Sequence, residues 1–495
     1  MFDKGSLSKS AELFLVELGD ETYQNQAGLK DSMNTAAIYR KYSKIFTIDN
    51  LNGIESALAL EKIGDETRKQ LLYLRRFIAE SYMGNETRTL NDEIATKSSQ
   101  AVVDFDGEDI PYRYVPVKII NEDNHDKRIA LERAREVVVS ALHQMRARRL
   151  NRIYQIIYEL GYKHYLDFYT EMKGFDIKEL STKLDGFIER TDSIYSKHLV
   201  ERLQKLRIPI ESAERADMGY VFRAKELDAH FNRDSVLAIT EKTLLDLGID
   251  LNAQKNIILD IEVRKKKSPR AFCMPIVIPD KIYLVTMPRG GLEDYKTMLH
   301  EMGHAQHFGN TDKTLPFEYK YLGDVSVSET YSFLFEYLTA DSYWVERNIK
   351  MKDKTEYLRF VYFWRLYMLR RYAAKLRYEI KLHICGLDRA GELYSETMNG
   401  IMKFKHPMNH CLDDLDDGFY SAQYLRAWFF EAQLRSVLKK EFGEHWFTSP
   451  NAGKYLKDLW AMGSRYNIEE LARHVGQREL DTIPLEMEIK EALRN

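Results

Sequence analysis

"TMLHEMGHAQHFGN", residues 297–310, carries His300, Glu301 and His304 in the spacing H-E-x-x-H. Upstream glycines followed by acidic residues predict the start of a helix, which should end at Gly309. On that helix His300 and His304 lie one turn apart on one face, so both imidazoles can reach a single metal ion. Glu301 would then lie beside the open position of the metal, where a carboxylate can take a proton from the attacking water. The stretch therefore predicts a zinc-binding helix with its own general base.

The alternative is that an ordinary amphipathic helix carries three polar residues by chance. The chain has only 13 His, so the full pattern is rarely matched at random. His307 follows His304 by three residues. Three ligands from one short helix would crowd the ion, so we expect His307 to pack or to form a hydrogen bond. A catalytic zinc needs three protein ligands, and the third must come from another helix.

The stretch "GDVSVSETYSFLFEYLTAD" (residues 323–341) has helical periodicity and offers two carboxylates on one face, Glu329 and Glu336. Glu329 lies 25 residues after His304, a separation that allows the chain to leave one helix and return. We therefore predict Glu329 as the third ligand, and Glu336 as a group that orients a metal-bound His. The alternatives are a capping box, Ser326-x-x-Glu329, and a solvated Glu336.

Length and composition describe a globular protein. A chain of 495 residues, with 44% hydrophobic and 30% charged residues, should form two or more subdomains. The formal charge of −3 gives no electrostatic reason to bind nucleic acid or a membrane. The three cysteines are far apart and no CxxC pair occurs, which indicates a reducing compartment. With no signal-peptide pattern and no apolar run of about 20 residues, we expect a cytoplasmic protein.

Helical periodicity dominates the chain, at residues 55–85, 126–172 and 177–205. A β-hairpin with an Asp-Gly turn is predicted at residues 101–119, and a Val/Ile-rich strand pair at residues 271–287. These patterns predict a mainly α protein with a small β-sheet beside the metal helix. We expect an N-terminal helical lobe over residues 1–200 and a catalytic metal-binding domain over residues 201–495.

The segment "HEMGHAQH", followed 25 residues later by "SETYSFLFE", resembles the thimet oligopeptidase and oligoendopeptidase F family of zinc metallopeptidases. The resemblance extends upstream through "SPRAFCMPIVIPDKIYLVTM" and downstream to "GFYSAQYLRAW", and covers roughly residues 200–480. It implies one Zn²⁺ per chain, held by His300, His304 and Glu329, with Glu301 as general base. It also implies a two-lobed, helical, zincin-type fold with the zinc deep in a substrate channel, which only short flexible peptides can enter.

In this family a Tyr and a His of the C-terminal segment stabilise the tetrahedral intermediate. Tyr420 and Tyr424 share a helical face, so either hydroxyl could have this role; the alternative is two tyrosines in a core seam. The chain departs from the family at Leu415, where thimet-type members carry His. His406 and His410 lie further upstream, and His410 is the candidate that we retain.

These features predict a zinc-dependent oligopeptidase that cuts internal bonds of short, unstructured peptides. The strand at residues 281–287 is the predicted edge for pairing with the substrate backbone. One alternative is a metallocarboxypeptidase of the carboxypeptidase Taq type, whose HPF and QD-x-HW segments are not found here. It would need a cation, for example Arg426, for the terminal carboxylate of the substrate. Another is a non-catalytic helical metal-binding protein, against which Glu301 argues, because zinc binding does not need that carboxylate. No feature indicates an oligomeric state.

Overall fold

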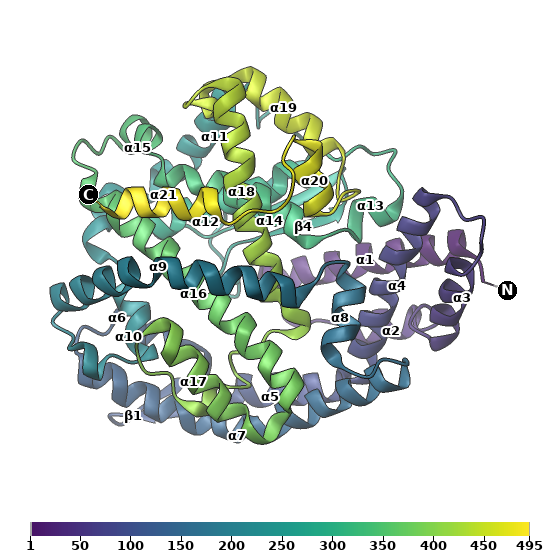
Figure 1. The fold of residues 1–495 in the computed structure, drawn as a ribbon, viewed down its shortest axis with the longest axis horizontal. Coiled ribbons are helices and arrows are strands. Elements are labelled where there is room, and N and C mark those ends of the chain that lie inside the picture. The colour runs from purple at the N-terminus through teal and green to yellow at the C-terminus, as the bar shows by residue number, and fades with distance from the viewer. Residues whose placement is uncertain (1, 495) are drawn as a thin grey trace. The chain divides into compact units, whose positions relative to one another are not determined.

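The computed structural model describes residues 2–494, and its elements are mainly helices, with two small sheets (Figure 1). The chain forms two compact units, each built from three separate segments. Unit 1 comprises Met1–Tyr82, Glu226–Leu358 and Arg426–Leu485, and unit 2 comprises Met83–Lys225, Arg359–Leu425 and Glu486–Asn495. This division differs from the single boundary expected at residue 200, because the chain returns to each unit after leaving it.

The helices of unit 1 are α1 (Lys4–Gln26), α2 (Thr35–Lys41), α3 (Ile48–Leu58), α11 (Val236–Asp246), α12 (Leu292–Gly309), α13 (Phe317–Tyr321), α14 (Val325–Glu336), α15 (Ser342–Ile349), α19 (Pro450–Ala461) and α20 (Ile468–His474). Those of unit 2 are α5 (Arg88–Gln100), α6 (Val115–Asn121), α7 (His125–Glu159), α8 (Tyr165–Lys173), α9 (Ile177–Lys205), α10 (Arg215–Val221) and α17 (Ala390–Met402). Four helices contribute residues to both units: α4 (Asp65–Glu86), α16 (Thr355–Cys385), α18 (Tyr420–Phe442) and α21 (Ile483–Arg494).

The sheet of unit 1 has the order β3-β5-β4, formed by β3 (Ile257–Asp260), β4 (Phe272–Val277) and β5 (Lys281–Val285). The antiparallel pairing of β4 with β5 confirms the predicted strand pair. The parallel pairing of β3 with β5 was not predicted. It makes β5 the central strand, so the prediction that residues 281–287 form a free edge for substrate is wrong.

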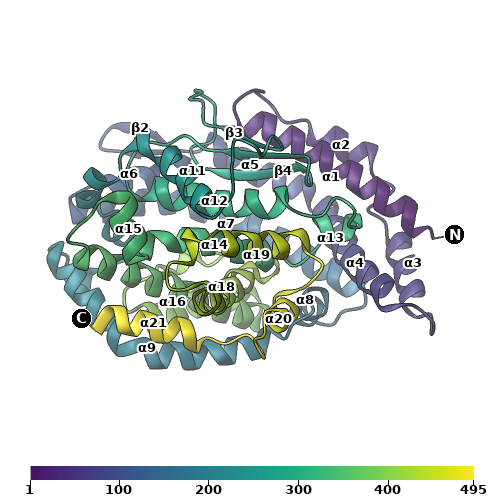
Figure 2. The same cartoon turned by 90° about the horizontal axis from the view of Figure 1, so that it is seen from above.

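This sheet lies between α1 and α12 (Figure 2). On one face Tyr23 of α1 stacks on Tyr283 of β5, with ring centroids 3.7 Å apart. Side chains alternate along a strand, so Ile282 and Leu284, both fully buried, point to the opposite face. On that face Ile257 of β3 packs against the end of α12. The sheet therefore supports α12, which carries the H-E-x-x-H residues.

The helices predicted from hydrophobic periodicity agree with most of the helices in those regions of the structure. α9 spans the predicted residues 177–205, and α12 ends at Gly309 as expected. The predicted helix at 126–172 is two helices, α7 and α8, because Gly161 adopts a left-handed conformation between them (φ 90°). Within residues 2–494, none of the helices combines the length and apolar character needed to cross a membrane.

The predicted hairpin of unit 2 consists of β1 (Val102–Phe105) and β2 (Glu108–Pro111), which pair antiparallel. Asp106 and Gly107 between them both have positive φ, 52° and 75°. Two consecutive positive φ values are typical of the tight turn that an Asp-Gly pair favours, so the predicted turn and strand pair are confirmed. The predicted range of 101–119 was too long, because the chain is helical from Tyr112 onward.

Candidate metal centre

The candidate metal site depends on a close approach of α12 and α14 in unit 1. A Cβ atom at Gly303 would lie 2.4 Å from the carbonyl oxygen of Tyr331 and 2.5 Å from the Cα of Ser332. No side chain fits there, so the glycine within H-E-x-x-H allows the two backbones to touch. The contact places the histidine face of α12 against α14.

Three potential ligand atoms converge at this contact. Nε2 of His300 lies 3.5 Å from Oε2 of Glu329, and Nε2 of His304 lies 3.4 Å from the same oxygen. The three residues offer ligand atoms that all lie within 4.8 Å of one another. Two imidazoles and one carboxylate are the donor set of a catalytic zinc site. The residues that the sequence predicted as ligands are therefore together, in an arrangement that fits Zn²⁺.

Each histidine is oriented through its other ring nitrogen. Nδ1 of His300 lies 2.9 Å from Oε2 of Glu336, and Nδ1 of His304 lies 2.7 Å from Oγ of Ser328. A proton on Nδ1 that is donated to these oxygens leaves the lone pair of Nε2 free for a metal. The role predicted for Glu336 agrees with this contact. Ser328 was missed, because a serine one residue before a ligand has no spacing signature of its own.

Electrostatics favours an ionised Glu329. Burial alone would raise the pKa of its carboxyl, but the charges and hydrogen bonds of His304 and His300 outweigh burial and hold that pKa well below its usual range. Burial would lower the pKa of His300, but its bonds to Glu329 and Glu336 raise that pKa well above its usual value. An ionised Glu329 could therefore serve as the charged ligand of a divalent ion.

Glu301 is half-buried on α12, next to the ligand His300. The thiol of Cys273, on β4, lies near it: burial raises the pKa of Cys273 well above its usual value, and the charge of Glu301 adds to that rise. On β4, Cys273 alternates with Phe272 and Met274, which pack on the α1 side. Cys273 therefore faces α12 from the sheet, a neighbour of the predicted base that the sequence did not indicate.

Two other polar residues near the ligands have structural partners. The N-cap of α14 is Asp324, whose side chain accepts a hydrogen bond from the amide of Ser326, so Ser326 is not the cap of a capping box. Arg426 is buried, with Nη2 2.9 Å from Oδ2 of Asp324 and Nε 3.0 Å from Oε1 of Glu469. Its bonds to these carboxylates do not favour a role in binding a substrate terminus.

His307 is fully buried, and its Nε2–H donates to the carbonyl oxygen of Gly463 at 3.1 Å. Burial lowers the pKa of His307 to about 4, so the ring is neutral at physiological pH. The hydrogen bond is of the kind that the sequence predicted.

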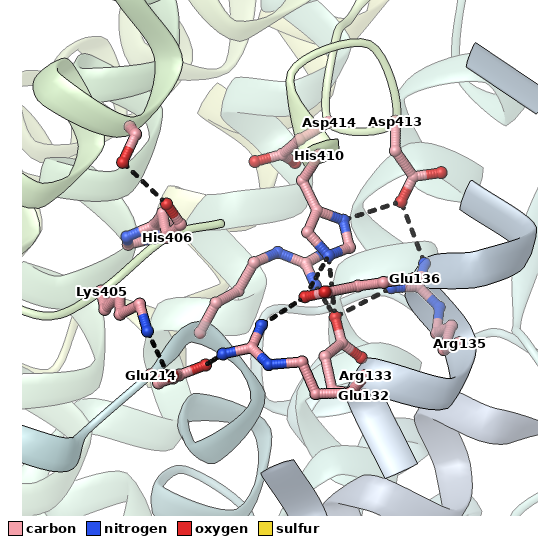
Figure 3. Close-up of polar contacts among 12 residues, drawn as sticks. Glu132, Arg133, Arg135, Glu136, Glu214, Lys405, His406, His410, Asp413 and Asp414 are labelled. Carbon is pink, nitrogen blue, oxygen red and sulfur yellow. Dashed lines mark hydrogen bonds and ion pairs between the residues drawn. The ribbon is translucent and has the colours of Figure 1, made fainter. Parts of the chain in front are cut away.

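The remaining candidates, Tyr420, Tyr424 and His410, belong to unit 2. The two tyrosines lie on the first turns of α18 with ring centroids 5.0 Å apart. His410 is fully buried among carboxylates and arginines (Figure 3). Leu415 occupies the position where a family His was expected. The part taken by these three side chains in catalysis stays a prediction.

No protein-family model matches this chain, and no curated protein matches it either. The candidate metal centre is therefore defined by its possible donor set, by the contacts that orient its histidines, and by the adjacent carboxylate of Glu301.

Proposed function

We propose that this protein is a zinc-dependent oligopeptidase that hydrolyses internal bonds of short, unstructured peptides. The observation that carries the proposal is the convergence of Nε2 of His300, Nε2 of His304 and Oε2 of Glu329, with Glu301 adjacent on the same helix. Zn²⁺ bound by these atoms would supply Lewis acidity toward the scissile carbonyl and the attacking water.

The side chains of this chain would perform the proton transfers. Glu301 takes a proton from water while the water oxygen adds to the carbonyl carbon of the peptide. When the C–N bond breaks, Glu301 passes that proton to the leaving nitrogen. Glu336 and Ser328 keep His300 and His304 in the orientation that presents Nε2. An intact base beside a complete ligand set supports an enzyme over a protein that only binds metal.

The substrate backbone would pair with β4. Within the sheet as described for residues 2–494, β4 pairs only with β5, so it is an edge strand, and it carries Cys273 near Glu301. An extended peptide can add to such an edge through main-chain hydrogen bonds. The resemblance to thimet oligopeptidase and oligoendopeptidase F further supports a two-lobed zincin-type fold with a channel, which would exclude folded proteins.

The test is Glu301→Gln, which preserves size and removes basicity. The variant should keep one zinc per chain at this centre and keep its thermal stability, while its turnover rate falls by roughly 10²–10⁴-fold.

Mass spectrometry of a defined peptide mixture shows whether cuts are internal or terminal; terminal trimming alone would point to a carboxypeptidase. Near-normal activity of Glu301→Gln would overturn the proposed mechanism. If Glu301→Gln loses zinc together with activity, Glu301 is a metal ligand and not the general base. Efficient digestion of native folded proteins would contradict the proposed substrate channel.

A further inference from the structure

Unit 2 contains a second group of metal-type ligands, none of which is a ligand of the proposed peptidase centre (Figure 3). Glu132 and Glu136 lie four residues apart on α7, so both carboxylates project from one face of the helix. His410 comes from a short 3-10 helix, Met408–His410, far away in the sequence. All three offer ligand atoms within 4.8 Å of one another.

The imidazole of His410 points between the two carboxylates. Its Nε2 lies 3.1 Å from Oε1 of Glu132 and 3.8 Å from Oε1 of Glu136. The side chain is fully buried, yet Nε2 has no hydrogen-bond partner of good geometry among residues 2–494. A buried nitrogen that faces two carboxylates without a hydrogen bond of good geometry to either is an arrangement that an ion would complete.

The separations are in the same range as those of the first site. There, each histidine Nε2 lies 3.4–3.5 Å from the oxygen of Glu329, and here the two distances from Nε2 lie on either side of that value. The other ring nitrogen is engaged in a similar way: Nδ1 of His410 lies 3.4 Å from Oδ2 of Asp413, as Nδ1 of His300 lies against Glu336. A carboxylate behind the imidazole is a recurrent feature of metal-bound histidine.

We propose that Glu132, Glu136 and His410 form a second metal site, which takes a divalent transition ion such as Zn²⁺ and ties α7 to the Met408–His410 turn. The site shares no metal ligand with the peptidase centre, and a His410 bound here would not serve as the oxyanion group that the resemblance implied. Its buried position suits a structural ion, which would hold the segment that leads toward α18.

The surrounding arginines restrict which ion fits. Oε1 of Glu132 accepts from Arg135 at 3.1 Å and from Arg215 at 2.8 Å, and Oε1 of Glu136 accepts from Arg133 at 2.7 Å. These cations already offset the charge of the carboxylates. Ca²⁺, which depends on oxygen ligands with net negative charge, should therefore bind weakly at this site. An ion that also bonds to imidazole nitrogen has a further source of affinity. The rival occupant is a proton on Nε2 of His410.

The experiment is a zinc titration of the full chain at neutral pH, with bound metal counted by elemental analysis after removal of free ion. We expect two zinc ions per wild-type chain. His300→Ala/His304→Ala should retain one, and Glu136→Gln should lower the wild-type count from two to one. Added zinc should raise the thermal midpoint of His300→Ala/His304→Ala by a few degrees, because binding to the folded state alone stabilises it.

Glu214→Gln is the matched control. Glu214 pairs with the same Arg133 and with Lys405, but it is not one of the three ligands, so this variant should keep two zinc ions. A count of one for wild type and none for folded His300→Ala/His304→Ala would overturn the proposal, and the cluster would then be an ion-pair network around a protonated His410. Equal counts for wild type and folded Glu136→Gln would overturn it too. Two zinc ions without peptidase activity would contradict the proposed function and leave this site standing.

Discussion

Oε2 of Glu336 lies 2.9 Å from Nδ1 of His300, while Nε2 of the same ring faces Oε2 of Glu329 at 3.5 Å. One imidazole is thus held between two carboxylates that lie seven residues apart on α14. The carboxylate at Nδ1 can only orient the ring and increase its basicity, whereas the one at Nε2 is placed to share the ion. The proposed roles of the two glutamates therefore differ, and substitution can separate them.

Glu329→Gln should abolish stoichiometric zinc binding at this centre, because it removes a charged ligand. Glu336→Gln should weaken zinc affinity by roughly 10–100-fold and leave the stoichiometry intact, since it disturbs only a group behind the ligand. Competition with a chelator of known affinity measures both. Glu293→Gln, an exposed residue on α12, is the control and should bind zinc as the wild type does. The reverse order of the two effects would make Glu336 the ligand.

Gly303→Ala should disrupt the metal centre without touching a ligand. The added Cβ would lie 2.4 Å from the carbonyl oxygen of Tyr331, a backbone atom that cannot move aside alone, so α12 and α14 must separate. We expect a lower thermal midpoint and weaker zinc binding. The control is Gly400→Ala on α17, where a Cβ meets nothing within 4 Å and alanine favours the helix. Zinc affinity equal to wild type in Gly303→Ala would mean that the close approach of the two helices is not needed for the metal centre.

The sequence predicted the elements whose signals are local. α12 and α14 have helical periodicity, and their ligands have fixed spacings, so His300, His304 and Glu329 could be proposed together from the sequence alone. The Asp-Gly turn likewise predicted the β1–β2 hairpin, because two residues decide its geometry.

What the sequence did not predict depends on contacts between distant segments. The order β3-β5-β4 follows from a parallel pairing with residues 257–260, and no local pattern shows which strand will be central. Cys273 lies near Glu301 only because the sheet packs on α12. Ser328 bonds to His304 only because Gly303 allows the helices to touch. The pairing of Glu132 and Glu136 with His410 joins residues more than 270 positions apart in the chain.

The tyrosine prediction is tested by removing hydroxyl groups. If a tyrosine of residues 418–428 stabilises the oxyanion, as the resemblance implies, Tyr420→Phe or Tyr424→Phe should lower kcat by roughly 10²–10³-fold, with zinc content unchanged. Tyr158→Phe, at a highly exposed position, should have wild-type activity. If both Tyr420→Phe and Tyr424→Phe keep full activity, the two half-buried rings serve only in packing and another group stabilises the intermediate.

Glu379, on α16, gives unit 2 a pH-dependent stability. Its Oε1 accepts from the amide of Asp416 at 3.0 Å and its Oε2 from Oγ of Ser421 at 2.8 Å, so this side chain joins α16 to the start of α18. Burial raises the pKa of Glu379 to about 8; Lys375 opposes that rise and the charge of Asp416 adds to it. At neutral pH the folded protein therefore holds a proton on this carboxyl.

The sign of the pH effect follows from proton counts. In the unfolded chain this carboxyl has a pKa near 4.5, so between pH 4.5 and about 8 the folded state binds more protons than the unfolded state. The free energy of unfolding that depends on this group is highest below about pH 4.5 and falls as pH rises toward 8.

Glu379→Gln cannot ionise, so its thermal midpoint relative to wild type should rise steadily from about pH 5 to about pH 8 and then level off. The total difference in unfolding free energy should be on the order of a few kcal/mol. Glu396→Gln, exposed on α17, should show a constant difference over the same range. A difference for Glu379→Gln that does not change with pH would mean that the carboxyl ionises normally in the folded protein.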